Sequence, residues 1–587
     1  MIRKLLIANR GEIAVRIART CRELGIEVVA VYSSADRESE VVRLADIAVN
    51  IGPPAPRRSY LNIPNIIEAA LQTGAEAVHP GYGFLSEDPD FAEICESAGL
   101  TFVGPPPSVM QDMGNKATAR RLMHEAGLPM LPGVVEPVRS VHEGQRIAAD
   151  IGYPVIIKAA AGGGGRGMSV VHSAADFSEA YVSTREVARA VFNDPAVYVE
   201  RYLAGARHVE VQVLCDQHGN GVSLGERDCS LQRRHQKLLE EAPAAHMTVE
   251  QREHLGALAV RGALSVGYTG AGTMEFLVDG SGEPYFMEMN ARIQVEHPVT
   301  EMLTGIDLIR EQILIADGLP LAFGQQDVRC SGAAIECRIN AEDPARGFAP
   351  TPGRLDVYRA PAGPWTRLDT GYREGDQVSP HYDSLLAKLI VWAPTRDQAL
   401  SRMDRALAEM AVSGPGLSTT ATLHRALLRH PDIRADRHDV QFLDREMPSL
   451  LASAAEIHQL GSRTPALTAD FVSAVPAPAQ PTWPRGLPPR PTPDGGHPNM
   501  NDTFTISDLM TLLSKKAGLP IADHTDNPSG RFSDVGLDSL AFLEMQTALK
   551  STYGVELPDD QTEHYTFGEI VDVVQSHLAM RPLEQAS

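Results

Sequence analysis

The chain has 587 residues, of which 43% are hydrophobic, and this composition is typical of a protein that folds into several domains with buried cores. It carries 75 acidic and 53 basic residues, a formal net charge of -22. Such a charge argues against nucleic acid as a standing partner, because phosphate backbones are bound by clustered Lys and Arg.

The cysteines and the N-terminus indicate the compartment. Six cysteines are scattered without a CxxC pair, so we expect neither zinc nor disulfides, but buried free thiols in a reducing cytoplasm. The apolar run at the N-terminus is interrupted at Arg10 and Glu12, before a signal-peptide core could form. No stretch approaches the roughly 20 apolar residues of a membrane span. We therefore expect a cytoplasmic protein without a membrane partner.

The first predicted elements alternate between strand and helix. From Lys4 a strand (LLIANRG) ends at a glycine turn, and the helix EIAVRIARTCRELG and the strand EVVAVYSS follow. The stretch AEAVHPGYGFLSED continues the pattern, with glycines that place a tight loop after a strand. This alternation predicts a parallel sheet with crossover helices. Near Gly114 a helix begins (NKATARRLMHEAG), and we expect the alternation to restart.

A glycine run is a candidate phosphate-binding loop. In YPVIIKAAAGGGGRGMSVV, a strand rich in Val and Ile ends at Lys158, and the glycines from Gly162 to Gly165 follow. Glycine lacks a Cβ, so its backbone N–H group can approach phosphate closely, and the nearby lysine adds positive charge. The run is neither a Walker A loop nor a dinucleotide fingerprint. Taken alone, such a run is more often a flexible loop between strands.

A hairpin further along the chain carries two acidic residues. In GTMEFLVDGSGEPYFMEMN, two alternating strands flank the turn 279–282. Glu275 lies on the first strand and Glu288 on the second, with Asn290 two residues further on the same face. Facing carboxylates and an amide oxygen suit Mg²⁺, a hard cation that prefers oxygen ligands. The alternative, a pair of solvated strand acids, is disfavoured by the aromatic residues of the hairpin, which indicate packing.

The segment that follows the hairpin alternates charged and apolar residues. Arg292 and Glu296 are separated by an even count, so on a strand or extended loop both could face one cavity. Arginine binds a planar anion such as bicarbonate through paired hydrogen bonds, and a nearby carboxylate can act as a base. A surface ion pair is the alternative that these two residues alone leave open.

Segments along most of the chain resemble the biotin carboxylase family of the ATP-grasp superfamily, as found in acetyl- and acyl-CoA carboxylases. They are IANRGEIAVRI, HPGYGFLSE, MGNKATAR, GERDCSLQRRHQK, EEAPA, MEMNARIQVEHPVTE, ECRINAEDP and YDSLLAKLI. The resemblance implies an α/β fold with a Rossmann-like N-terminal domain (1–112) and an ATP-grasp domain (113–330) whose mobile lid covers about 131–203. An α+β C-terminal carboxylase domain (331–447) would follow.

The resemblance also implies the site residues. Those implied to bind ATP are Lys116, Lys158, Gly164, Gly165, Glu200, Arg201, Tyr202, Leu203, His208, His235, Glu275 and Glu288. Those implied to bind two Mg²⁺ or Mn²⁺ ions are Glu275, Glu288 and Asn290. Those implied to hold bicarbonate or biotin are Lys237, Arg292, Gln294, Val295 and Arg338.

The implied catalytic residues are Arg292, Glu296, Arg338 and Lys237. By resemblance, Glu296 deprotonates bicarbonate for attack on the γ-phosphate of ATP. The carboxyphosphate that forms breaks down to CO₂ and phosphate, and the phosphate takes the ureido proton of biotin. Arg338 would stabilise the resulting enolate, a charge that appears only during the reaction.

The composition changes between residues 448 and 501. Proline at this density cannot supply the ladder hydrogen bonds of a core, and the segment is predicted to be a semi-rigid, extended linker. A short, mostly helical region (502–580) follows. Within it, the apolar residues Leu540, Leu543, Met545 and Leu549 have helical spacing, with Ser539 at the start of the helix.

Ser539 alone would be interpreted as a helix cap. The context GLDSL followed by an acidic helix, however, resembles acyl carrier proteins, especially those of aromatic polyketide synthases. That resemblance implies a small helical bundle with a 4′-phosphopantetheine arm on Ser539, an anion that a helix N-terminus favours.

The sequence shows neither a Met-Lys-Met biotin-attachment site nor a carboxyltransferase region. We therefore expect biotin to arrive on a separate biotin carboxyl carrier protein, and the carboxyltransferase to be another subunit. A phosphopantetheinyl transferase, polyketide or fatty acid synthase enzymes and a homodimer partner complete the expected interactions. The predicted activity is ATP- and bicarbonate-dependent carboxylation of biotin for malonyl-type units. The alternatives are an ATP-grasp ligase acting on pantetheine-bound substrates and a silent carboxylase scaffold that displays a carrier.

Overall fold

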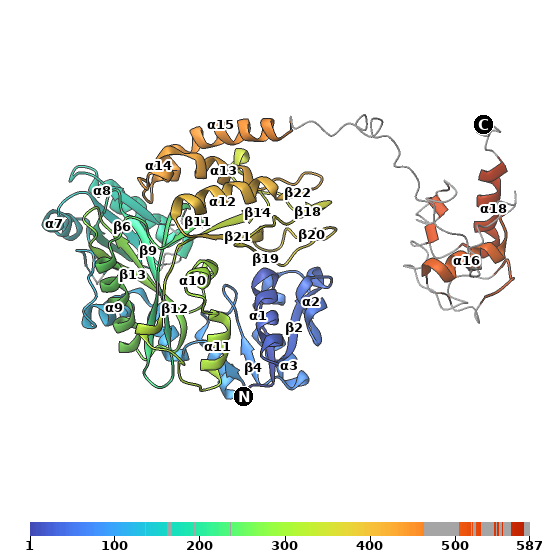
Figure 1. Cartoon of the computed structure of the whole chain (residues 1–587), viewed down its shortest axis with the longest axis horizontal. Helices are drawn as coiled ribbons and strands as arrows, with labels where there is room; N and C mark the ends of the chain where they lie inside the picture. The colour runs from blue at the N-terminus through green and yellow to red at the C-terminus, as the bar shows by residue number, and fades with distance from the viewer. Residues whose placement is uncertain are drawn as a thin grey trace, which may run out of the picture. The chain divides into compact units, whose positions relative to one another are not determined.

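The structure is a computed structural model. It describes residues 1–462 except 135, 136, 161–166, 193 and 235, and residues 504–517, 519, 524–529, 545, 546, 549, 550, 555 and 565–579. The chain divides into two compact units, Met1–Ala469 and Asp470–Ser587 (Figure 1). Each unit is described by itself below.

The first unit begins with a five-stranded parallel sheet in the order β3-β2-β1-β4-β5. Its strands are β1 (Lys4–Ile7), β2 (Glu27–Ser33), β3 (Ile47–Gly52), β4 (Ala77–His79) and β5 (Thr101–Phe102). Helix α1 (Gly11–Glu23) buries its apolar face against the sheet. The predicted parallel sheet with crossover helices is confirmed.

The glycine-rich loop predicted to follow a strand comes directly after β4. Gly81 has a φ of 63°, and a Cβ at this position would lie 3.0 Å from Asn9 Nδ2 and 3.2 Å from a side-chain carbon of Ile13. Both the left-handed backbone and this close approach favour glycine. The loop is thereby fixed close to α1, which starts just after the strand β1.

An eight-stranded sheet forms the centre of the first unit, in the order β13-β12-β9-β10-β11-β14-β21-β19 (Figure 1). The strands are β9 (Arg207–Cys215), β10 (Gly221–Arg233), β11 (Gln236–Ala242), β12 (Gly270–Val278), β13 (Pro284–Asn290), β14 (Ala333–Asn340), β19 (Thr366–Thr370) and β21 (Leu385–Ala393). All their pairings are antiparallel. The expectation that strand-helix alternation restarts after Gly114 therefore holds only in part. Helices separate some strands, as α9 (Val249–Ser265) separates β11 from β12, but short turns join β9, β10 and β11, and likewise β12 and β13, directly.

The large sheet joins the predicted ATP-grasp and C-terminal domains. Strand β11 lies in the first of these segments and β14 in the second, and they pair from Leu239–Cys337 to Ala242–Ala334. Residues at this seam come from both segments, so a site built here depends on both.

A three-stranded sheet in the order β7-β6-β8 lies within the segment predicted to be the lid. Its strands are β6 (Val155–Ala159), β7 (Met168–Val171) and β8 (Val197–Arg201), and the helices α7 (Val141–Ile151) and α8 (Phe177–Phe192) pack on them. Buried Val155, Ile157, Val199 and Phe177 give this segment a core of its own. The glycine run between β6 and β7 lies outside the described residues.

The predicted linker starts too early. Helix α15 (Phe442–Ser462) continues through Pro448, and Leu450, Ala454 and Ile457 pack into the core beneath it. These three residues recur at intervals of four and three, the spacing of one helix face, so burial of that face outweighs the proline near the start of the helix. The rest of the predicted linker, from residue 463, lies outside the described residues.

The described part of the second unit contains the helices α16 (Ile506–Ala517) and α18 (Phe567–Ala579). Leu509, Leu513, Phe567 and Ile570 form their common core. Met545 and Leu549, two of the predicted apolar helix positions, are buried in the same cluster. This agrees with the predicted helical carrier domain. Ser539, Leu540 and Leu543 lie outside the described residues.

The structure bears on two predictions about the cellular compartment, one about the cysteines and one about membrane spans. Five of the six cysteines are free and buried, but Cys330 is exposed, because it lies in the irregular segment between α11 (Leu308–Ala316) and β14. The expectation of buried thiols is wrong for this residue. Among the described helices, none is long and apolar enough to cross a membrane.

Candidate active site

The predicted metal-binding hairpin is present, and its acids are directly opposed. Glu275 on β12 pairs in register with Glu288 on β13, and the ring centroids of buried Phe276 and Phe286 lie 6.2 Å apart in an edge-to-face arrangement. Asn290 Nδ2 donates to Glu275 Oε1 at 2.9 Å. Two like charges opposite one another destabilise a sheet unless a cation lies between or beside them. The three oxygen-bearing side chains therefore fit a divalent cation.

The pairing continues as a row of charged residues across four strands. Glu275 lies opposite Glu210 on β9, and Glu210 lies opposite Arg227 on β10. Arg227 is fully buried and its Nε donates to Glu210 Oε1 at 2.5 Å. Neighbouring strands thus supply a cation for a carboxylate that burial would otherwise make very costly.

Lys237 on β11 lies at the centre of three carboxylates. Its Nζ is 2.5 Å from Glu210 Oε2, 3.1 Å from Glu275 Oε1 and 2.7 Å from Glu296 Oε1. Burial alone would lower the pKa of Lys237, but the three carboxylates outweigh it and raise that pKa well above its usual range. The lysine therefore carries a fixed positive charge that faces both the hairpin and Glu296.

His208 on β9 supplies a second contact to the hairpin. Its Nε2 is 3.0 Å from Glu275 Oε2. Burial opposes the charge on both groups, yet the attraction between them raises the pKa of His208, and Lys237 and His208 together lower the pKa of Glu275. Glu275 is thus held in its ionised form, which is the form that binds a metal ion.

Glu296 precedes helix α10 (His297–Thr304) and is fully buried. Its Oε1 accepts from Lys237, and its Oε2 accepts from Arg338 Nη2 at 2.9 Å. Burial would raise the pKa of Glu296, but Lys237, Arg338 and Arg227 lower it well below the usual range. A buried, ionised carboxylate beside two cations can bind or deprotonate a small polar substrate.

Arg292 belongs to the same network but has other partners. Its Nε donates to Glu87 Oε2 at 3.0 Å, its Nη1 to Gln294 Oε1 at 2.8 Å and its Nη2 to Asn290 Oδ1 at 3.0 Å. Gln294 Nε2 in turn donates to Glu275 Oε1 at 3.2 Å. The segment from Arg292 to Glu296 is a loop that ends in a turn, not a strand. Metal coordination by Asn290 would replace its bond from Arg292.

The loop that holds Glu296 is also fixed by a residue of another strand of the large sheet, paired in register with Arg338. Lys388 on β21 is fully buried, and its Nζ donates to the carbonyl oxygen of Val295 at 2.9 Å and lies 3.0 Å from Glu12 Oε1. The carbonyl oxygen of Val295 thus accepts a hydrogen bond from Lys388. The backbone N–H of Val295 is the group of this residue that could donate to an anion.

The predicted nucleotide residues near the lid also meet. Lys158 Nζ is 2.8 Å from Glu200 Oε2, and Arg120 Nη1 is 2.5 Å from Glu200 Oε1. Burial opposes ionisation of Glu200, but Lys158, Arg120 and Lys116, the first residue of α6, lower its pKa. These cations gather where strands β6 and β8 lie side by side.

Strand β8 ends at Arg201, one residue after Glu200. The backbone N–H of Arg201 donates to Pro132 and that of Tyr202 to Pro154, while the Tyr202 hydroxyl bonds to Gln441 from the segment before α15. Leu203 follows, half-buried. Gly164, Gly165 and His235 lie outside the described residues.

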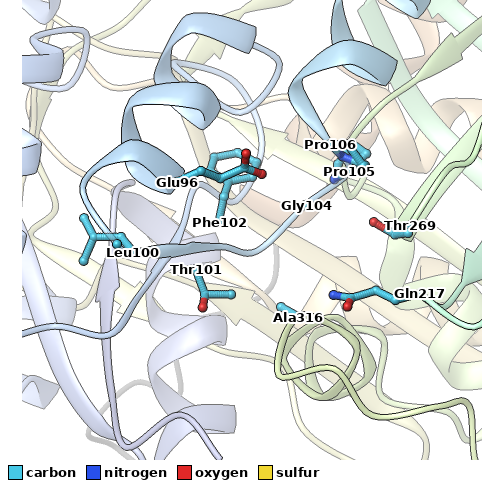
Figure 2. A pocket seen from close by; sticks show the side chains of 11 residues that line it. Glu96, Leu100, Thr101, Phe102, Gly104, Pro105, Pro106, Gln217, Thr269 and Ala316 are labelled. Carbon is cyan, nitrogen blue, oxygen red and sulfur yellow. The ribbon is translucent and has the colours of Figure 1, made fainter.

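A pocket elsewhere in the first unit lacks this chemistry. It holds about 380 Å³, and Thr101 and Phe102 lie across it from Gln217 and Thr269 (Figure 2). None of the predicted site residues lines it.

Comparison with known proteins identifies the first unit. Residues 1–110 match the family described as biotin carboxylase, N-terminal domain, and residues 336–445 match its C-terminal domain. Biotin carboxylase 1 of Bacillus subtilis is 52% identical over 445 residues, which is 76% of this chain and 98% of that protein. The chain belongs to the biotin carboxylase family. Residues 115–323 match the ATP-binding domain of the carbamoyl-phosphate synthase L chain.

Other relatives agree. The biotin carboxylase of a Nostoc species is 54% identical over 428 residues, 73% of this chain and 95% of that protein. The biotin carboxylase domain dimer of Hydrogenobacter thermophilus 2-oxoglutarate carboxylase, solved with MgADP, ADP and bicarbonate, is 46% identical, with a TM-score of 0.72, and covers 77% of this chain and 98% of that one. Campylobacter jejuni biotin carboxylase in a β,γ-ATP complex is 44% identical, with a TM-score of 0.73. The match covers 76% of this chain and 99% of that one. The chain is therefore an ATP-dependent ligase, a biotin carboxylase.

The second unit matches a different family. Residues 507–574 match the phosphopantetheine attachment site family, and this range includes Ser539. The carboxylase thus carries a fused phosphopantetheine carrier region.

Sequence reasoning missed several residues of the carboxylase network. Besides Glu12, Arg120 and Lys388, they include Glu87, Glu210, Arg227 and Glu240. A signal existed for Glu210, because His208, Glu210 and Gln212 alternate with valines along β9 and all three are buried. Polar residues repeated with a period of two on a buried strand indicate a polar face inside the protein. No comparable pattern indicates Glu87, which reaches the site from a loop.

We predict that Glu288→Gln abolishes the metal-dependent cleavage of ATP. A neutral amide replaces a charged oxygen ligand opposite Glu275, so the site loses affinity for Mg²⁺. ADP release should be measured across a range of Mg²⁺ concentrations. The control is Glu283→Gln, an exposed acid of the adjoining turn, which should behave as the parent does. Parental ADP release by Glu288→Gln would disprove the metal assignment.

Proposed function

We propose that the carboxylase unit moves a carboxyl group from bicarbonate to biotin on a separate biotin carboxyl carrier protein, as the biotin carboxylase component of an acetyl- or acyl-CoA carboxylase. The observation that carries this proposal is the position of Glu296, which is buried between Lys237 and Arg338 and joined through Lys237 to Glu275 of the hairpin. The residues proposed as base, anion site and metal site are thereby in contact.

The residues implied for ATP would act at two places. Lys158 and Lys116, with Gly164 and Gly165, would hold its phosphates. Glu200 supports this role, because it pairs with Lys158 and its pKa is lowered by the charge of Lys116, so both positive charges lie near it before ATP binds. The residues proposed to contact the rest of the nucleotide are Glu200, Arg201, Tyr202, Leu203, His208 and His235. Glu275, Glu288 and Asn290 would bind two Mg²⁺ or Mn²⁺ ions, which neutralise phosphate charge when bound.

Bicarbonate would lie among Lys237, Arg292, Gln294 and the backbone N–H of Val295. By taking over hydrogen bonds of Lys237, it would reduce the hold of that cation on Glu296 and so return basicity to the carboxylate. Glu296 would then accept the bicarbonate proton while the bicarbonate oxygen attacks the γ-phosphorus and ADP leaves.

The carboxyphosphate formed in this way would break into CO₂ and phosphate. The phosphate would accept the ureido N–H proton of biotin, and the nitrogen would form the new bond to the carbon of CO₂. Negative charge develops on the ureido oxygen before that bond forms, and Arg338 would stabilise it. A donor placed in advance for a charge that exists only during the reaction lowers the barrier without tightening substrate binding.

We further propose that Ser539 carries a 4′-phosphopantetheine arm, and that the fused carrier takes acyl groups made from malonyl-type units. The resemblance of the segment around GLDSL to carriers of aromatic polyketide synthases supports a place in polyketide or fatty acid assembly. The proposed partners are a carboxyltransferase subunit, a phosphopantetheinyl transferase, synthase enzymes and a second copy of this chain.

We predict that the parent chain cleaves ATP only with bicarbonate, faster with biotin, and that Arg338→Lys keeps much of the bicarbonate-dependent cleavage but loses carboxybiotin formation. Lysine keeps the charge but not the planar fork. The expected loss is on the order of 2.7–4 kcal/mol in the barrier, as for removal of one such donor. ADP and carboxybiotin should be measured in the same reactions. Parental carboxybiotin formation by the variant would mean that Arg338 does not stabilise the enolate.

We predict that CoA and a phosphopantetheinyl transferase add one pantetheine arm to the chain, and that Ser539→Ala blocks the addition. Ser533→Ala, in the same segment, is the matched control and should be modified normally. Intact-mass measurement decides the outcome: an adduct that survives in Ser539→Ala would refute the attachment site. Biotin carboxylation should be unchanged in Ser539→Ala, because every residue proposed for that reaction belongs to the carboxylase unit.

A further inference from the structure

Arg338 is held by two buried acids, of which the proposed reaction uses only one. Its Nε donates to Glu240 Oε1 at 2.7 Å, and its Nη2 lies 2.6 Å from the same oxygen and 2.9 Å from Glu296 Oε2. Glu240 and Glu296 are both fully buried. The guanidinium therefore lies between two carboxylates, and the one from β11 binds it along the Nε edge.

Glu240 has a second acid as its neighbour. Glu336 on β14 pairs directly with it across the sheet and is also fully buried. Among the described residues, neither oxygen of Glu336 has a hydrogen-bond partner, and Oε2 of Glu240 has none either. Of the four oxygens of this pair, only Glu240 Oε1 has a donor within the described part of the chain, and it comes from Arg338. Two adjacent carboxylates supplied in this way cannot both be ionised at this depth, because like charges and lost solvation penalise the pair.

The negative charge of the pair belongs on Glu240. Burial raises the pKa of Glu336 well above its usual range although the charge of Lys388 opposes the rise, and nearby Glu240 raises it further. Burial also raises the pKa of Glu240, but Arg338 limits the rise to about 7. Arg338 binds Glu240 and not Glu336, whose two oxygens have no partner among the described residues. Glu336 is therefore the protonated member, and Glu240 is the member of the pair that ionises.

This arrangement prevents a competing geometry. A guanidinium beside a single carboxylate tends to form a bidentate pair with it, using two donors. Without the charge of Glu240, Arg338 would turn fully onto Glu296, which would occupy the base and withdraw the donors from the substrate. With Glu240 on its other edge, Arg338 contacts Glu296 through Nη2 alone.

We propose that Glu240 is a positioning residue for the biotin step, which holds Arg338 between two carboxylates so that its remaining donors face the substrate. This inference rests on the proposed role of Arg338. It gives a function to a carboxylate that does not itself touch ATP, bicarbonate or biotin in the proposed reaction.

The test compares two amides on paired strands of the full-length chain. Glu240→Gln keeps the shape and one acceptor oxygen but removes the charge, whereas Glu336→Gln replaces an acid that is already neutral and makes no bond to Arg338. Free biotin serves as the substrate, and carboxybiotin formation is divided by the bicarbonate-dependent ADP release measured without biotin. We expect this ratio to fall at least about tenfold in Glu240→Gln and to change less than about threefold in Glu336→Gln.

Two further results would distinguish positioning of Arg338 from a purely structural role of Glu240. Because Arg338 acts on a charge that develops during the reaction, kcat for biotin should fall as much as kcat/KM in Glu240→Gln. Combining Glu240→Gln with Arg338→Lys should lower carboxylation no further than Arg338→Lys alone, since the carboxylate acts through the guanidinium. Should Glu240→Gln fail to fold, Glu240→Asp, which keeps the charge on a shorter side chain, is expected to lower the ratio as well.

An unchanged ratio in Glu240→Gln, an equal fall in Glu336→Gln or an additive loss in the double variant would each overturn the positioning role. Failure of the proposed function looks different: Arg338→Lys would then form carboxybiotin at the parental rate, whatever Glu240→Gln does.

Discussion

The carboxylase unit depends on keeping ionised carboxylates buried in the middle of an antiparallel sheet. Glu210 and Glu296 are fully buried, and each is tolerated because Arg227, Lys237 or Arg338 lies within hydrogen-bond distance on a neighbouring element. Removing one partner of such a pair costs about 3–5 kcal/mol, because it leaves an uncompensated buried charge. The same pairing holds the side chains in place, because moving one of them would leave another buried charge without its partner.

That constraint explains why the predicted domains share one structure at the site. Lys237 comes from β11 and Arg338 from β14, strands on either side of the boundary drawn near residue 330, and both contact Glu296. Lys388 adds the third segment, because it joins Glu12 of the N-terminal helix to the carbonyl of Val295. A base that must be held between cations from several segments cannot be assembled within any one of them.

The sequence predicted much of this, and its failures have physical causes. The hairpin with Glu275, Glu288 and Asn290 followed from local alternation, which reports which face a side chain occupies. Glu240 and Glu336 lie opposite each other only because β11 pairs with β14, and pairing between strands distant in sequence leaves no local pattern. The end of the carboxylase unit was misjudged for another reason: the proline content of the segment from 448 onward was given more weight than the helical spacing of Leu450, Ala454 and Ile457, which pack into the core.

The two units also divide the chemistry between separate cores. In the described part of the chain, the cluster around Leu509 and Phe567 contains no residue of the carboxylase, and the carboxylase clusters contain no residue of the carrier. Each unit therefore has an apolar core of its own among the described residues. What the covalent link adds is effective concentration, which a tether sets through its length and stiffness without any new contact. In the proposed function, a carboxylated biotin and an acyl thioester would still need a transferase between them, so the link would be useful only in an assembly where that transferase reaches both.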